Sequence, residues 1–562
     1  MQTLGNSDYL VFFIYFLIVA GYGIMVYRRK KKATVSASHD YFLAEGSLTW
    51  WAIGASLIAS NISAEQFIGM SGSGFKMGLA IASYEWLAAA TLIIVAIFFI
   101  PVYLKNKIYT MPQFLHQRYN AKVALIMAVF WLVLYIVVNL MSILYLGAVA
   151  ISQISGLNFY ACIIFLAVFA IIITLGGMKV IGYTDVIQVF FLVFGGLVAT
   201  YIALNLIAEQ SGESGILSGF KLLKAEAGDH FQMMFKKDNP NYLDLPGLSI
   251  LVGGMWIVNL NYWGCNQYIT QRALGADLPT ARKGILFAAF LKIFMPVIVV
   301  LPGIAAYLLH QKGMFQTEML DSKGVLDVNK AYPSLLNLLP SGMKGLAFAA
   351  LTAAIVASLA GKANSIATIF TLDIYKKAIN ENASEKRLVS LGKITVIVSM
   401  MIAIVMALAL GEKLMGEGKQ GFQYIQEYTG FFSPGIFAMF ILGFFWKRTT
   451  SNAALFATIG GFIMSIILKF LPSWADLSFL QAYGFSKLNA GGLYEIPFID
   501  RMMFVFLFCI LGMFIISKYE NSKGIVPKGL IVDKEMFKMS KGFAIGSIIV
   551  CVILTVLYTV FW

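Results

Sequence analysis

Six polar side chains lie in, or at the ends of, segments that are otherwise apolar and long enough to cross a bilayer: Asn61, Gln66, Glu85, Asn259, Lys292 and Gln426. A polar group left unpaired in hydrocarbon costs several kcal/mol, so such residues usually face a water-filled path or a ligand. We therefore expect the six side chains to line one cavity of a membrane transport protein.

The helical spacing around these residues pairs each hydrogen-bonding group with an apolar or aromatic neighbour. The expected shared faces are those of Gln66 with Met70, Glu85 with Ala88, Asn259 with Tyr262 and Trp263, and Gln426 with Phe422. Polar groups of this kind can bind several hydroxyls, while aromatic faces cover the C–H side of a sugar ring. Glu85 and Lys292 would offset each other's charge, which favours a neutral, hydroxyl-rich ligand; the alternative is an ion pair that only joins two helices.

The composition is that of a polytopic membrane protein. Of the 562 residues, 59% are hydrophobic and 12% are charged, far from the values of soluble domains. The net charge of +14 is spread over short loops, as the positive-inside rule predicts, so nucleic-acid binding is not indicated. The sequence shows no spacing typical of disulfides or metal sites, and no nucleophile and base of an intramembrane hydrolase. We expect a protein that is not an enzyme; a channel would need rings of charges or carbonyls instead of one mixed pocket.

Segments of roughly 20 apolar residues, bounded by charges or by Gly and Pro, predict fourteen membrane crossings. They lie near residues 8–28, 47–72, 80–102, 121–154, 158–176, 182–208, 248–272, 281–310, 341–376, 386–411, 422–445, 452–471, 500–517 and 541–562. An even number places both termini on one side, and the bias of lysine and arginine among the loops places that side outside the cell. The predicted location is the cell membrane, which in a bacterium is the inner membrane.

Two of these segments are predicted to break near mid-membrane, around residues 58–63 and 253–261. Irregular backbone is tolerated there only beside a cavity, and paired broken helices indicate a transporter binding site. Their small residues could instead serve close helix packing. Because the two segments are five crossings apart, spans two to six and seven to eleven would form an inverted pair. The predicted organisation is an N-terminal helix and basic loop (1–46), two five-helix repeats (47–210 and 248–445) separated by an external loop (211–247), and three C-terminal helices (446–562).

The stretch from Ala55 to Gly74, ASLIASNISAEQFIGMSGSG, resembles the solute:sodium symporter family, in particular its sodium/galactose branch. Further similar stretches are residues 79–86, 183–191, 261–272, 283–292, 364–376 and 422–430, so the resemblance covers nearly the whole chain. It implies a leucine-transporter-type (LeuT) core of two inverted five-helix repeats, a hexose bound midway through the membrane, and sodium as the coupling ion.

The resemblance also implies roles for individual residues. The sugar-contacting positions of the family fall on Gln66, Glu85, Ala88, Asn259, Lys292 and Gln426, and its hydrophobic gates on Met70, Tyr84, Phe422, Tyr262 and Trp263. Ala88 departs from the family, which has a serine there, so one hydroxyl that could reach the sugar is missing. Asp185 matches a residue beside the ion exit route.

At the sodium site this chain differs more strongly from the family pattern. The resemblance implies sodium ligands at Ala59, Ile62, Ala354 and a pair of serines, which is Ala357-Ser358 in this chain. Gly361 stands where another serine is usual, and Lys362 replaces an apolar residue. Residues 354, 357, 358, 361 and 362 share one helical face, and Gly361 would leave room for the Lys362 side chain to fold back toward the site.

We therefore expect the Lys362 ammonium to replace the sodium ion. Two monovalent cations about 4 Å apart repel by roughly 4 kcal/mol at an effective dielectric constant of 20, so a charged Lys362 would exclude sodium. A buried lysine could instead exchange a proton with each cycle. In the remaining alternative, Lys362 extends toward the membrane interface and leaves a weakened sodium site intact.

The sequence thus predicts an alternating-access hexose transporter that is independent of sodium or linked to protons. An ordinary sodium-coupled sugar symporter is the alternative within the same class, and a sugar-sensing receptor is the alternative of another class. No cofactor is expected beyond the coupling ion. The predicted partners are a hexose and the lipid bilayer, and the oligomeric state is left open.

Overall fold

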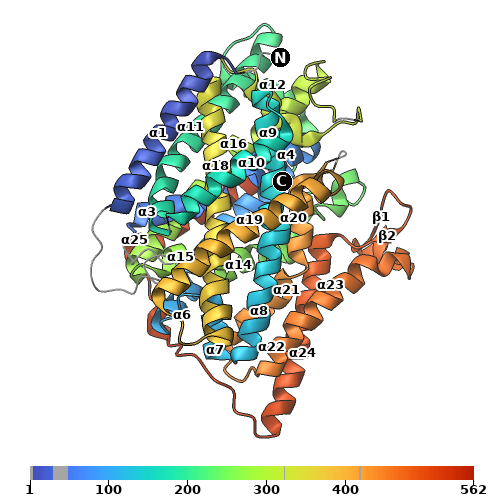
Figure 1. Cartoon of the computed structure of the whole chain (residues 1–562). Helices are drawn as coiled ribbons and strands as arrows, with labels where there is room; N and C mark the ends of the chain where they lie inside the picture. The colour runs from blue at the N-terminus through green and yellow to red at the C-terminus, as the bar shows by residue number, and fades with distance from the viewer. Residues whose placement is uncertain (1–3, 29–47, 177, 322, 417–418) are drawn as a thin grey trace.

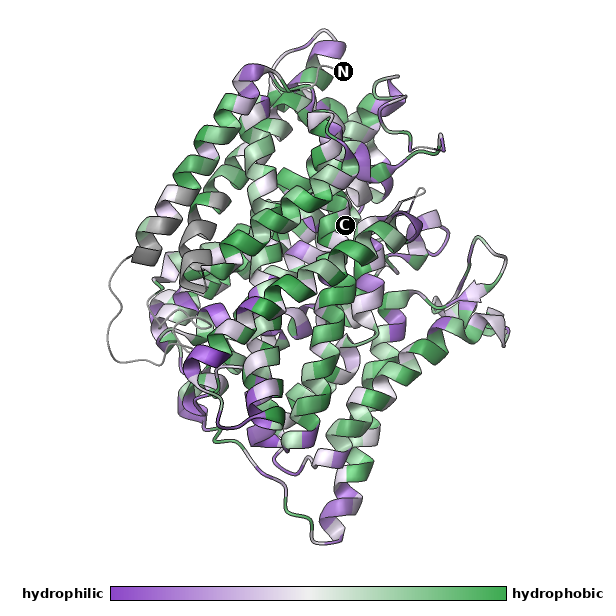
Figure 2. Cartoon of the chain, in the orientation of Figure 1, coloured by the Kyte–Doolittle hydropathy of each residue, from purple (hydrophilic) through white to green (hydrophobic). Residues whose placement is uncertain are grey.

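The computed structural model describes residues 4–28, 48–176, 178–321, 323–416 and 419–562. Most of these residues are helical, and the helices run between two ends of the molecule (Figure 1). Hydrophobic residues cover the helices, whereas hydrophilic residues gather at helix ends and in loops (Figure 2). Residues 29–46, which contain the predicted basic loop, lie outside the described residues.

The following bounds define the helices, where η marks a π-helical or 3-10-helical turn. The first part of the chain contains α1 (Asn6–Arg28), α3 (Trp50–Asn61), η2 (Glu65–Met70), α4 (Ser71–Met77), η3 (Gly78–Ala82), α5 (Ser83–Ile94), η4 (Val95–Phe99), α6 (Ile100–Lys105), α7 (Met111–Arg118), α8 (Ala121–Val133), η5 (Leu134–Leu140), α9 (Met141–Ser155), α10 (Phe159–Leu175), α11 (Met178–Gln210), α12 (Ile216–Glu226), η6 (Gly228–Phe231) and η7 (Pro240–Leu243). The second part contains α13 (Ser249–Val252), α14 (Gly254–Cys265), α15 (Gln267–Leu274), α16 (Leu278–Gln311), η8 (Val328–Lys330), α17 (Ala331–Leu336), α18 (Met343–Thr368), η9 (Ile369–Ile379), α19 (Glu385–Met415), α20 (Gly421–Gly430), α21 (Ser433–Phe445), α22 (Ser451–Leu455), η10 (Phe456–Gly460), α23 (Gly461–Phe470), η11 (Leu471–Ser473), η12 (Ser478–Tyr483), α24 (Phe498–Ser522), η13 (Lys534–Phe537) and α25 (Lys541–Val560).

Many of these helices are long and apolar enough to cross a membrane. Within the described residues nine helices meet this condition, and α20 with α21 forms a tenth span if their bend of 50° is counted as one broken crossing. Two further apolar segments that the structure describes, residues 6–19 of α1 and the whole of α10, are shorter than this condition requires. A polytopic helical membrane protein is therefore confirmed, and the number of fourteen crossings stays a prediction.

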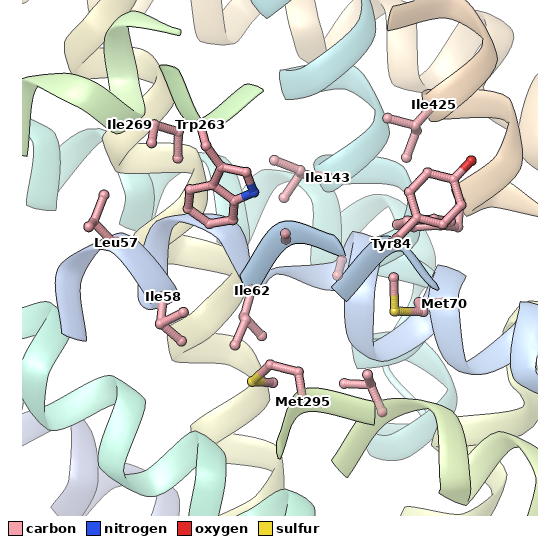
Figure 3. Packing of buried hydrophobic residues seen from close by; sticks show 14 of the residues in the cluster. Leu57, Ile58, Ile62, Met70, Tyr84, Ile143, Trp263, Ile269, Met295 and Ile425 are labelled. Atoms are coloured by element: carbon pink, nitrogen blue, oxygen red, sulfur yellow. The ribbon is translucent and has the colours of Figure 1, made fainter. Parts of the chain in front are cut away.

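The first predicted break is present between α3 and η2. Helix α3 ends at Asn61, and Ile62 is extended, with φ −84° and ψ 109°. The Ser63 hydroxyl accepts a hydrogen bond from the Glu65 amide at 3.2 Å, and the Gln66 side chain accepts one from the Ser63 amide at 3.3 Å. Side chains that bind nearby backbone in this way compete with the helical ladder, which explains the break. Figure 3 shows Ile62 pointing from this break toward Met295, with Trp263 on the other side of the ribbon.

The second predicted break, at residues 253–261, is correct only at its first residue. Gly253 is non-helical, with φ −121° and ψ −122°, but residues 254–261 belong to the regular helix α14. The main interruption follows at Asn266, which is extended between α14 and α15, with φ −95° and ψ 126°. The adjacent glycines have a packing role instead, since a Cβ at Gly254 would lie 2.0 Å from the Ile499 carbonyl oxygen on α24.

Close packing of α16 against α3 brings Asn61 and Lys292, one predicted site residue on each helix, close together. A Cβ at Gly54 would lie 2.7 Å from the Gly284 carbonyl oxygen, so the two backbones cross in direct contact. Asn61 follows Gly54 by seven residues and Lys292 follows Gly284 by eight. Both lie two helical turns beyond the crossing, because a turn holds 3.6 residues.

The expectation of an all-helical chain needs one small correction near the C-terminus. Strands β1 (Lys487–Leu488) and β2 (Tyr494–Glu495) pair antiparallel, with Lys487 opposite Glu495 and Leu488 opposite Tyr494. The predicted external loop contains the short helices α12, η6 and η7, and its Met233 amide donates to the Phe561 carbonyl at 2.9 Å.

Candidate functional site

The predicted polar residues surround one buried cavity. It is lined by all six residues assigned to sugar contact (Gln66, Glu85, Ala88, Asn259, Lys292 and Gln426), by Asn61, and by the gate residues Tyr84, Phe422, Tyr262 and Trp263. Met70 is fully buried on η2 but is not among the lining residues. The six polar side chains of the apolar segments therefore share one cavity, as expected, and their contact with a sugar stays a prediction.

A buried ion pair crosses the cavity. The Lys292 ammonium on α16 lies 2.5 Å from the Glu85 carboxylate on α5, and both side chains are nearly inaccessible to solvent. The same ammonium donates to the Asn61 side chain at the end of α3 and lies 5.2 Å from the centre of the Trp263 ring. The predicted offset of the two charges is therefore present, and Asn61 ties it to the broken helix.

Tyrosine hydroxyls close one side of the cavity. Tyr262 accepts a hydrogen bond from the Asn61 amide at 2.9 Å and another from the Tyr268 hydroxyl. The Tyr135 hydroxyl donates a hydrogen bond of 2.8 Å to the side chain of Asn266. Asn266 is the extended residue between α14 and α15. The residue predicted as the inner gate is thus bonded both to the first helix break and to the segment after the second.

An aromatic pair covers another side of the cavity. The rings of Tyr84 and Phe422 meet edge to face with centres 5.0 Å apart, and the Tyr84 hydroxyl donates to Gln423 at 3.4 Å. Helix α20 can place Phe422 there because Gly69 on η2 has no side chain; a Cβ at Gly69 would lie 2.9 Å from the Phe422 amide nitrogen.

The N-terminus of α20 is held by two polar anchors. Asn329 accepts from the Gly421 amide at 3.2 Å and donates to the carbonyls of Met415 and Lys419 at 3.0 and 3.1 Å. Gln420 donates to Asp244 in the loop before α13 at 3.1 Å. Burial raises the pKa of the Asp244 carboxyl above its usual value. These bonds fix Phe422 and Gln426 over the cavity.

The residues predicted to hold the cation lie where α18 packs against α3. Ala59, Ile62, Ala354, Ala357 and Ser358 are all at most 1% exposed. The Ser358 hydroxyl donates to the Ser60 carbonyl of α3 at 3.3 Å, so the predicted helical face of α18 does meet the first broken helix.

The room predicted beside Gly361 for the Lys362 side chain is taken by another cation. A Cβ at Gly361 would lie 2.7 Å from the Arg272 Nη2, and Arg272 also donates to the Ser56 hydroxyl at 2.9 Å. The guanidinium therefore needs the absence of a side chain at residue 361, and Lys362 does not fold back there.

Lys362 points instead toward the break and the cavity. Its ammonium lies 3.4 and 3.5 Å from the two carboxylate oxygens of Glu65 and 5.3 Å from the centre of the Tyr268 ring. The side chain is 2% exposed and lines the cavity. An extension of Lys362 to the membrane interface is therefore wrong.

Glu65 is the residue that reasoning from the sequence missed. It lines the cavity beside Lys362, whereas the sequence alone predicts no role for it in the site. The requirement that a buried lysine has a counter-charge could have identified it. Asp185 lies in α11, and its side chain falls outside the described part of the structure.

A helical membrane protein with two interrupted helices around a buried polar cavity belongs to the class of membrane transporters. The chain is a member of the sodium:solute symporter family, whose model matches residues 41–461. Members of this family are transporters and not enzymes.

Similar proteins support this assignment. A sodium/glucose cotransporter of Vibrio parahaemolyticus is 46% identical over 99% of this chain and 98% of its own length. A human sodium/myo-inositol cotransporter 2 is 32% identical over 83% of this chain and 70% of its own length. Among solved structures, a substrate-bound, outward-open sodium-coupled sialic acid symporter aligns with a TM-score of 0.74 and 21% identity, covering 94% of this chain and all of that chain. This last likeness concerns the fold.

Proposed function

We propose that this protein carries a hexose of the galactose or glucose type across a bacterial inner membrane by alternating access. The observation that carries the proposal is the convergence of six polar side chains on one buried cavity, with Glu85 and Lys292 compensating each other's charge. A neutral polar cavity favours an uncharged, hydroxyl-rich substrate. The name of the 46% identical relative, a sodium/glucose cotransporter, points to the same class.

The aromatic residues of the cavity suit a sugar ring. Hydroxyls would exchange hydrogen bonds with the amides of Gln66, Asn259 and Gln426, while the rings of Tyr84, Trp263 and Phe422 offer apolar faces to the C–H groups. Ligand sites commonly combine a mainly apolar lining with a few placed polar groups.

Alternating access would use the two helix breaks as hinges. Residues predicted as gates contact neighbouring elements at the cavity: Tyr262 accepts a hydrogen bond from Asn61, and Tyr84 packs on Phe422. Opening one gate requires loss of a few contacts at α3 or α20, whereas the remaining helices could move as rigid units. The proposed orientation has both termini outside the cell, in fourteen crossings with two inverted five-helix repeats.

In this proposal the charge of the Lys362 ammonium takes the place of the sodium ion from a position beside Glu65 and the Tyr268 ring, next to the predicted sodium site. It is a buried cation on the helical face of α18 that carries Ala354, Ala357 and Ser358, and Glu65 provides its counter-charge from just beyond the helix break. A sodium ion held about 4 Å away would be repelled by roughly 4 kcal/mol at an effective dielectric constant of 20. Transport would then be independent of sodium, or linked to a proton carried by the pair.

Ordinary sodium symport is the second candidate. It is favoured by the short distance, 3.3 Å, between the Ser358 hydroxyl and the Ser60 carbonyl, because the oxygen-bearing groups of α3 and α18 still face each other. In that case Na⁺ would bind near Ala59, Ile62, Ala354 and Ser358, and Lys362 would only weaken it. Asp185 would lie beside the ion exit route.

The test is counterflow of labelled galactose and glucose in proteoliposomes, with sodium replaced by choline and with pH varied. We expect the native chain to transport without sodium and Lys362→Ala to gain sodium stimulation. Strict sodium dependence of the native chain would overturn the tethered cation but keep the sugar transporter. Sugar binding without any counterflow would indicate a receptor instead.

A further inference from the structure

An apolar groove on the outside of the helix bundle is separate from the sugar cavity. It lies between α16 and α25, with Phe287 and Phe290 on one wall and Phe543, Ile549 and Val550 on the other. Trp50, the first residue of α3, packs edge to face on Phe287 with ring centres 5.6 Å apart and closes one end. None of these residues lines the sugar cavity.

Glycines of α25 keep this groove open. Gly542 and Gly546 both line it and are one helical turn apart. A Cβ at Gly542 would meet no atom within 4 Å, whereas one at Gly546 would lie 2.6 Å from the end of the Leu286 side chain. No protein atom of the described residues therefore occupies the space beside Gly542, at the mouth of the groove.

The mouth of the groove is cationic. Lys283 and Ser540 line it, and the exposed Lys541 stands between Ser540 and Gly542 at the N-terminus of α25. Within the described residues neither Lys283 nor Lys541 forms an ion pair. The positive end of the α25 helix dipole adds to the two ammonium charges. An apolar channel that ends in two cations is complementary to an amphiphile with an acyl chain and an anionic head.

The length of the groove favours a lipid over a second protein helix. From Ser540 to Val550 α25 rises about 15 Å, at 1.5 Å per residue, which is half of the roughly 30 Å hydrocarbon core. One leaflet, and hence one acyl chain, spans this depth, whereas a partner helix would need a stripe across the whole membrane. A neighbouring groove on the other half of α25, lined by residues such as Trp86, Leu554 and Tyr558, has no charged residue in its lining.

We infer that the groove between α16 and α25 binds an anionic phospholipid of the leaflet at the N-terminus of α25. Lys283 and Lys541 contact the phosphate, and an acyl chain lies along Phe287, Phe543 and Val550. In the proposed orientation this leaflet is the cytoplasmic one, where basic residues near anionic headgroups each contribute about 1 kcal/mol.

The test compares binding of phosphatidylglycerol and phosphatidylcholine, with identical acyl chains, to the purified full chain by native mass spectrometry. We expect the native protein to bind one phosphatidylglycerol about 10- to 30-fold more strongly than phosphatidylcholine, as two lysines near the headgroup would give. The double variant Lys283→Gln/Lys541→Gln should lose this preference. The matched control, Lys386→Gln/Lys393→Gln, removes two exposed lysines of α19 and should keep it.

A second variant tests the groove itself. Gly542→Leu fills the open mouth without meeting a neighbouring atom at its Cβ, and it should abolish the tightly bound lipid while the protein stays monodisperse in size-exclusion chromatography. Unchanged phosphatidylglycerol binding in both the double variant and Gly542→Leu would overturn the inference. A lipid-free dimer that disappears in Gly542→Leu would also overturn it, because the groove would then hold a second copy of the chain.

Discussion

Two buried lysine–glutamate pairs border the polar cavity, and they differ in how tightly they are held. Lys292 and Glu85 are 2.5 Å apart, with Asn61 as an additional partner. Lys362 and Glu65 are 3.4 Å apart. Each ammonium also faces an aromatic ring, Trp263 at 5.2 Å and Tyr268 at 5.3 Å. Because the aromatic surroundings of the two ammonium groups are similar, the different lysine–glutamate distances must have another cause.

The difference follows from the elements that carry the carboxylates. Glu85 lies in the first turn of the regular helix α5, whereas Glu65 opens the π-helical η2 directly after the break in α3. The Glu65 side chain is 10% exposed and that of Glu85 is 3% exposed. The tight pair is therefore suited to be a fixed polar wall of the pocket, and the looser pair lies where a hinge motion would change it.

Removal of Glu85 should have the largest effect. Glu85→Ala leaves the Lys292 charge buried without its carboxylate, which costs roughly 3–5 kcal/mol of stability, and it takes an acceptor from the pocket. We expect loss of measurable sugar binding in calorimetry and a lower unfolding temperature. The double variant Glu85→Ala/Lys292→Met should regain stability without regaining binding. Native affinity in Glu85→Ala would remove this pair from the site.

The next effect separates the pocket from the cation pair. Gln426→Ala leaves both Lys292 and Lys362 in place. It removes one side-chain amide that would otherwise bind a hydroxyl of the sugar. Leaving a buried partner unsatisfied costs about 1–3 kcal/mol, so sugar affinity should fall roughly 5- to 150-fold while the unfolding temperature and the response to sodium stay unchanged. If Gln426→Ala alters the response to sodium in counterflow, pocket and cation site are not independent.

The sequence predicted the elements of this comparison unevenly. The polar residues of the cavity could be found because a polar side chain in an apolar segment needs a partner, and the Ser63 and Gln66 side chains beside Ile62 explain the first break. The interruption at Asn266 was missed because it is confined to one residue, and regular helices lie directly on both sides of it. The use of Gly361 by Arg272 could not be predicted, since it depends on how closely α15 approaches α18 in three dimensions.

The coupling within the looser pair should be smaller than within the tight one. A double-mutant cycle with Glu65→Gln and Lys362→Met is expected to give an interaction energy in the lower part of the range of roughly 0.5–3 kcal/mol for contacting residues. The cycle of Glu85 and Lys292 should exceed it. Thermal unfolding in the same detergent measures both. Equal coupling energies in the two cycles would contradict the distinction between a fixed and a movable pair.

Ala88→Ser should have the smallest effect, because it adds one hydroxyl beside an intact pocket. Ala88 lines the cavity one helical turn after Glu85, so a serine hydroxyl there can bind the same substrate as the tight pair. A hydrogen bond contributes about 0.5–1.5 kcal/mol net, which corresponds to roughly a 2- to 12-fold gain in sugar affinity. Because residue 88 contacts the pocket and not Lys362, the sodium response should stay that of the native chain, as counterflow with and without sodium can measure. A gain in affinity that appears only in sodium would mean that the sugar and the cation site act as one unit.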